Sequence, residues 1–117
     1  MENTNLGRIE VSPTAIASLA GQATLECYGV VGMVDKNLKS GIVRLLQPSG
    51  HRQGVGVKIE NDRIEIDLYV VIEYGTRIAA VAHNIQSVVK YSVEKALGVP
   101  VAAVNVHVRD LRVSDEK

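Results

Sequence analysis

The chain has 117 residues and a mass of 12.6 kDa, which is the size of one ordinary domain. Hydrophobic residues make up 46% and charged residues 22%, a balance that excludes an intrinsically disordered chain. Lys plus Arg and Asp plus Glu each number 13, so the net charge gives no indication of a nucleic-acid partner. A single cysteine excludes an internal disulfide and a cysteine-rich zinc site.

The first half of the chain predicts a short strand followed by a helix. Polar and apolar residues alternate over residues 6–11, and Ser12-Pro13 is a strong helix start. Apolar residues then repeat at helical spacing, so a helix over residues 12–27 is expected, ending before Gly29. Residues 30–34 predict a strand or extended turn, residues 38–46 a short helix, and residues 47–54 a loop.

The second half predicts a hairpin, a long helix and a last strand. Residues 55–60 and 63–74 alternate in character on either side of Asn61-Asp62, which is a good tight-turn pair. Apolar residues occupy every even position from 64 to 74, so one face of the hairpin is buried. A broad apolar stripe predicts a helix over residues 76–97, and alternation over residues 104–108 predicts a strand that ends or bulges near Asp110.

These elements predict an α+β fold with two layers. We expect a mixed β-sheet of four to five strands, with the helices at about 12–27 and 76–97 on one face and the other face open. The strand order stays open, because spacing alone does not decide it. A single domain over residues 1–117 is expected, with residues 1–5 and 114–117 frayed.

Five stretches, in order along nearly the whole chain, match a known family. They are residues 7–12 (GRIEVS), 28–33 (YGVVGM), 67–71 (DLYVV) with Tyr74-Gly75, the helical residues Ala82, Ile85 and Gln86, and 104–108 (VNVHV). In these stretches the chain resembles the alkaline shock protein family of bacteria, also described as envelope stress response proteins. The resemblance implies small non-enzymatic proteins that self-associate, some held at the membrane by a separate anchor protein. It also implies, for some members, a link to fatty-acid metabolism.

No residue pattern points to catalysis, a cofactor or a metal. Cys27 falls on the apolar stripe of the first helix, where burial as a small hydrophobe is favoured over a reactive thiol. His51, His83 and His107 lack the spacing of metal ligands, and each is interpreted as solvated. The carboxylates at 65, 67 and 73 are interpreted as the solvated side of a strand. The resemblance adds no catalytic motif, so we expect no enzyme activity.

Two surfaces are candidates for binding. Tyr69 and Val71 interrupt an otherwise polar strand face, and either form an exposed apolar patch or are covered by residues 36–54 or a neighbouring strand. With His107 and Arg109 they form the predicted partner interface. Residues 36–58 hold five basic and no acidic residues, and the predicted basic surface consists of Lys39, Arg44 and Arg52.

We therefore expect a non-catalytic interaction or adaptor protein linked to envelope stress or lipid metabolism. Its expected partners are a protein, such as a membrane anchor protein or a fatty-acid-metabolism enzyme, and a second copy of itself. No stretch approaches the roughly 20 apolar residues of a membrane helix, so we expect a cytoplasmic protein, recruited to the membrane by a partner. The alternative is a KH-like nucleic-acid-binding module that uses the basic residues 36–58, with Gly29 to Gly32 as its G-x-x-G loop, although two valines inside that loop favour a buried turn.

Overall fold

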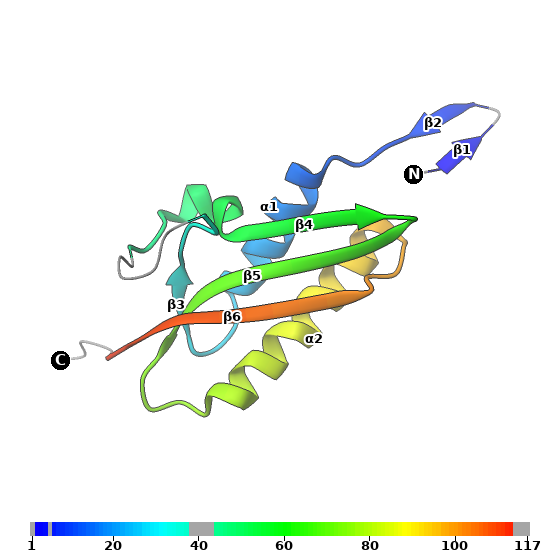
Figure 1. Cartoon of the computed structure of the whole chain (residues 1–117). Helices are drawn as coiled ribbons and strands as arrows, with labels where there is room; N and C mark the ends of the chain where they lie inside the picture. The colour runs from blue at the N-terminus through cyan, green and yellow to red at the C-terminus, as the bar shows by residue number, and fades with distance from the viewer. Residues whose placement is uncertain (1, 5, 38–43, 114–117) are drawn as a thin grey trace.

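The computed structural model describes residues 2–4, 6–37 and 44–113. The fold has two layers: one is a β-sheet and the other consists of two helices (Figure 1). Helices α1 (Pro13–Leu25) and α2 (Ile78–Leu97) lie on the same face of a four-stranded sheet, as predicted. The strands are β3 (Val30–Met33), β4 (Val55–Glu60), β5 (Arg63–Glu73) and β6 (Ala103–Arg112). The expected α+β class and its two main helices are confirmed.

Strand β5 is the centre of the sheet. Antiparallel β4 and β3 follow one another along one side of it, pairing with residues 63–68 and 70–72 respectively. On the other side β6 runs parallel to β5, because the long α2 connection carries the chain back to the same end. The register shifts between the Val70–Val108 and Val71–Asp110 pairs, leaving Arg109 as the extra residue. The bulge predicted near Asp110 is therefore confirmed.

Alternation along β5 builds the core. Its even-numbered residues Ile64, Ile66, Leu68, Val70 and Ile72 are completely buried and face the helices. From α2, buried residues come every four positions: Val81, Ile85, Val89 and Val93. This stripe is narrower than the sequence suggests, since Ala96 is exposed. Each large apolar side chain fully buried here contributes roughly 1.5–3 kcal/mol.

The start of α1 and the end of α2 lie where local chemistry predicts. The Ser12 hydroxyl accepts a hydrogen bond from the Ala15 amide at 3.1 Å, and Pro13 occupies the first helical position. Helix α2 ends at Gly98, whose φ of 76° lies in the left-handed region that favours glycine. The hairpin turn Asn61-Asp62 also has two positive φ values, 51° and 65°, as a two-residue turn requires.

The segment between β3 and β4 differs from the prediction. Residues 44–46 are extended, not helical: Leu45 forms an isolated bridge with Val34, and the Leu46 amide donates to the Met33 carbonyl at 2.7 Å. The expected loop is instead a 3-10 helix, η1 (Pro48–Gly54). The apolar residues at 45 and 46 fit the spacing of the predicted helix, but extended backbone sends these two leucines to opposite sides. Residues 38–43 of the predicted short helix lie outside the described residues.

The N-terminal strand pairs locally and not with the sheet. Strands β1 (Glu2–Thr4) and β2 (Gly7–Ile9) form an antiparallel hairpin that projects from the two layers (Figure 1). The predicted strand over 6–11 is confirmed at 7–9, and residues 2–4, where fraying was expected, are assigned as a strand. Residues 1, 5 and 114–117, where fraying was also expected, lie outside the described part of the chain.

Candidate interaction face

The outer face of the sheet, on the side away from the helices, carries a row of polar and aromatic residues. Cross-strand pairing sets Asp67 opposite Asn105 and Tyr69 opposite His107. Glu65 lies on the same face of β5, two residues before Asp67. Arg109, the extra residue at the register shift in β6, contacts the ring of Tyr69. We call these six residues the outer-face row.

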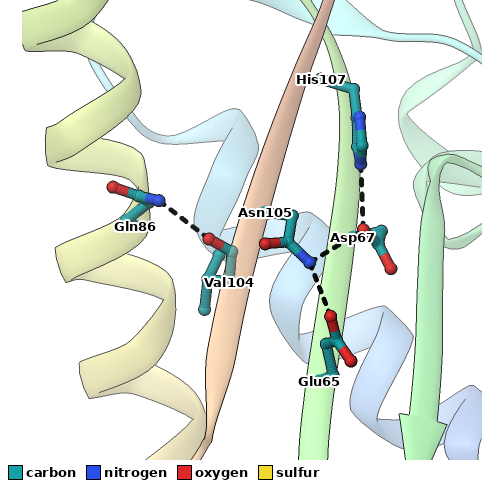
Figure 2. A network of polar contacts seen from close by, with 6 residues as sticks. All are labelled: Glu65, Asp67, Gln86, Val104, Asn105 and His107. Carbon is teal, nitrogen blue, oxygen red and sulfur yellow. Dashed lines mark hydrogen bonds and ion pairs between the residues drawn. The ribbon is translucent and has the colours of Figure 1, made fainter.

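Hydrogen bonds fix the lower half of the outer-face row (Figure 2). The Asn105 amide nitrogen donates to Glu65 Oε2 at 3.0 Å and to Asp67 Oδ1 at 3.1 Å. His107 Nε2 lies 2.9 Å from the same Asp67 oxygen, so the protonated nitrogen donates to the carboxylate. One carboxylate oxygen thus orients two side chains of the neighbouring strand, which reduces the ordering that a bound partner would require.

Aromatic contacts fix the upper half of the row. The rings of His107 and Tyr69 are stacked, with centroids 4.5 Å apart and planes 9° from parallel. The Arg109 guanidinium carbon lies 4.9 Å from the Tyr69 ring centroid, within the range of a cation–π contact. The structure therefore brings together three of the four predicted interface residues, and His107 keeps a side-chain exposure of 40%.

Val71 does not belong to this exposed row. It is completely buried, although it points away from the helix-side core. Its partner on β3 is Gly32, and a Cβ atom built on Gly32 would lie 3.0 Å from Leu45 Cδ2, so Leu45 covers this end of the outer face. The prediction of an exposed interface at Val71 is wrong, and the alternative that residues 36–54 cover it holds for Leu45.

Two of the three residues of the predicted basic surface lie in the described part of the chain. Arg44 and Arg52 are exposed, and Lys39 lies outside the described residues. Arg52 lines one pocket with Lys36, while Arg44 is not among the residues of that pocket. The G-x-x-G stretch is the start of β3 and not a buried turn, since Val31 is 41% exposed.

The remaining candidate residues are Cys27, His83 and His51. Cys27 is buried, its thiol donates to the Ala23 carbonyl at 3.4 Å, and burial followed by the nearby Glu26 charge raises its pKa. His83 is exposed, as expected. His51 is not solvated as predicted: its Nε2 donates to the Ser18 carbonyl at 2.9 Å, and its ring packs over Gly21. Among the described residues no three His, Cys, Asp or Glu side chains could hold a metal ion.

One surface feature was not predicted from the sequence. A groove of about 480 Å³ lies at the N-terminal end of α2, where Tyr28 and Gly75 line it together with Arg77 and Ala80. Tyr28 and Tyr74 are 77% and 66% exposed. The sequence feature that could have indicated these exposed tyrosines is the repeated Tyr-Gly pair. Gly29 (φ 89°) and Gly75 (φ 97°) both turn the chain, and the preceding tyrosine stays exposed.

Comparison with known proteins decides the family. Residues 1–113 match the family model of the alkaline shock protein 23 family, which is described as having a cell envelope-related function. The chain belongs to this family. The resemblance noted in its sequence is confirmed, and no described helix is long and apolar enough to span a membrane.

Family relatives align over nearly the whole chain. The uncharacterised protein YloU of Bacillus subtilis is 42% identical over 96% of this chain and 94% of its own. The uncharacterised protein Spy1614 of Streptococcus pyogenes is 39% identical over 97% of this chain and 95% of its own. A stress response regulator gls24 homolog of Streptococcus pyogenes is 26% identical over 94% of this chain and 62% of its own.

Proposed function

We propose that this protein is a non-enzymatic adaptor that binds a protein partner through the outer-face row. The observation that supports this proposal is the stacked Tyr69–His107 pair with Arg109 beside it, on a sheet face that no described helix covers. Tyrosine and arginine are the residue types that most often dominate binding energy at protein interfaces. Holding them in place before binding lowers the entropy lost in the complex.

The cell envelope-related description of the family supports a partner that acts near the cell envelope. We infer that the protein acts in the cytoplasm and is recruited to the membrane by its partner, either a membrane anchor protein or an enzyme of fatty-acid metabolism. The cell envelope-related description of the family supports the first, and the name of the gls24 relative supports a stress response. The same row is proposed to serve contacts between copies of this chain.

Tyr91 offers a matched control for Tyr69. It lies on the exposed side of α2, is 64% exposed, and also has a cation near its ring, with Lys95 Nζ 5.6 Å from the centroid. It differs from Tyr69 in lying on the helix layer and away from the outer face. Removing either ring deletes a tyrosine with a cation–π contact, but only Tyr69→Ala alters the outer-face row.

The test is a crosslinked pull-down of tagged protein from native cells, with cytosol and membrane fractions analysed separately by mass spectrometry. Wild type and Tyr91→Ala should recover the same protein partner after nuclease treatment, and Tyr69→Ala should lose it by about tenfold or more. Arg109→Ala, at an exposed position, should weaken recovery without affecting folding. Equal recovery by all four proteins, or recovery that depends on nucleic acid, contradicts the proposal.

A further inference from the structure

Strand β4 forms a free edge of the sheet. It pairs with β5 on one side, and no other described strand pairs with its opposite side (Figure 1). The two-residue turn at 61–62 makes Glu60 and Arg63 a hydrogen-bonded pair, and such pairs alternate along an antiparallel ladder. The N–H and C=O groups of Val57 and Ile59 therefore point away from β5, toward the free edge.

The beginning of this edge opens into a pocket of about 290 Å³. Its lining comes from three segments: the first two turns of α1, Lys36 after β3, and the end of η1 with the start of β4. The lining residues are Pro13, Thr14, Ala17, Lys36, Arg52, Gln53, Val55 and Val57. Val57 thus belongs both to the pocket and to the free edge, so one bound chain could occupy both.

The pocket has an unbalanced positive charge. Lys36 and Arg52 are both exposed, and neither forms an ion pair with a described residue. Among the described residues, no acidic side chain lines the pocket. Two cations that converge from separate segments attract a carboxylate, and the fork of the arginine suits its two oxygens. The partly buried, apolar Val57 beside them favours a ligand that is not charged throughout.

We propose that the β4 edge binds an extended acidic segment of a protein partner as an additional strand, with one of its carboxylates held by Lys36 and Arg52. The main-chain groups of Val57 and Ile59 would supply the binding energy that does not depend on sequence, and the pocket would supply the preference for acid. This inference goes beyond the proposed function, because it uses a surface at the edge of the sheet and not the outer-face row.

A nucleic acid is the weaker occupant on the same observations. Its phosphates would satisfy Lys36 and Arg52, but its backbone does not offer the N–H and C=O alternation that pairs with a strand edge. The two occupants also differ in what they protect. Only an added strand shields the amide hydrogens of Val57 and Ile59 from exchange with solvent, whereas the Lys58 amide is already bonded to β5.

The experiment selects short random peptides on the purified full chain by display and then measures amide hydrogen exchange by NMR with the enriched peptide. We expect enrichment of Asp or Glu among β-branched residues, and slowed exchange at Val57 and Ile59 with little change at Lys58. A version of the peptide that is N-methylated at alternate residues should not bind. The Lys36→Glu, Arg52→Glu double variant should bind at least about tenfold more weakly, while Lys95→Glu binds as wild type.

Several results would overturn the proposal. They are failure to select any acidic peptide, slowed exchange only at other amides, and full binding by the double charge-reversal variant. A single-stranded oligonucleotide that binds more tightly than the peptide, and that abolishes the peptide's protection of the Val57 and Ile59 amides, would favour nucleic acid instead. Tyr69→Ala should leave peptide binding unchanged, so failure at this edge and failure of the outer-face row are distinguishable.

Discussion

Glu94 holds the connection between α2 and β6 in place. Its Oε2 atom accepts hydrogen bonds from Lys90 Nζ at 2.7 Å and from the Val101 amide at 2.8 Å. Lys90 Nζ also donates to the Val101 carbonyl at 2.8 Å, which closes a ring around the turn. The hydrogen bond from Lys90, followed by the one from the Val101 amide, lowers the pKa of Glu94 below its ordinary value of 4.5.

The lowered pKa of Glu94 predicts acid-sensitive stability. A carboxylate with a lower pKa in the folded state stabilises the fold above its unfolded pKa, and this contribution is lost as pH falls through the folded value. Thermal unfolding measured from pH 7 to pH 3 should therefore show a smaller decrease in Glu94→Gln than in wild type. Glu60→Gln, at an exposed position on β4, should follow the wild-type curve. Parallel curves for all three proteins would contradict this role of Glu94.

Backbone conformation at Gly98 decides how α2 ends. Its φ is 76°, and its amide donates to the Glu94 carbonyl at 2.8 Å. A Cβ atom built there would contact nothing within 4 Å, so a side chain would be disfavoured by backbone conformation alone. The helix terminus therefore depends on a glycine although there is ample space around it.

Gly98→Ala should destabilise the fold by about 1 kcal/mol, because alanine disfavours the left-handed region. Gly50 provides the control, since its φ is −106° and a Cβ atom there would approach only the end of the Gln53 side chain, at 4.0 Å. Gly50→Ala should be neutral or slightly stabilising. Urea unfolding of both variants measures the difference. Equal midpoints would show that the conformation at Gly98 is not what ends the helix.

Elements with one-sided burial were predicted well, and those with mixed surroundings were not. The even positions of β5 are all buried, so a period of two identified the strand and its inner face. Leu46 packs against the core and Leu45 lies beside Gly32, so two neighbouring leucines are both covered although their backbone is not helical. The parallel pairing of β5 with β6 was not predictable, because residue spacing carries no information on which strand lies beside which.

At the scale of the whole molecule, the two surfaces proposed for binding are separate. The outer-face row could be predicted in large part, since Tyr69, His107 and Arg109 lie on neighbouring strands with the expected parity. Val71 could not, because its cover comes from Leu45 in a segment whose conformation was mispredicted. For the pocket at the β4 edge, the sequence indicated only a basic stretch. That Lys36 and Arg52 line the same pocket depends on the path of the chain between β3 and β4.

A protein partner is proposed to contact the outer-face row in the cell. The most direct test replaces Tyr69 by the photoreactive residue p-benzoylphenylalanine, and Tyr91 by the same residue in a control, followed by irradiation of living cells. We expect a specific crosslinked protein at position 69 that is absent at position 91. Crosslinking at position 91 alone, or at neither position, would contradict the account.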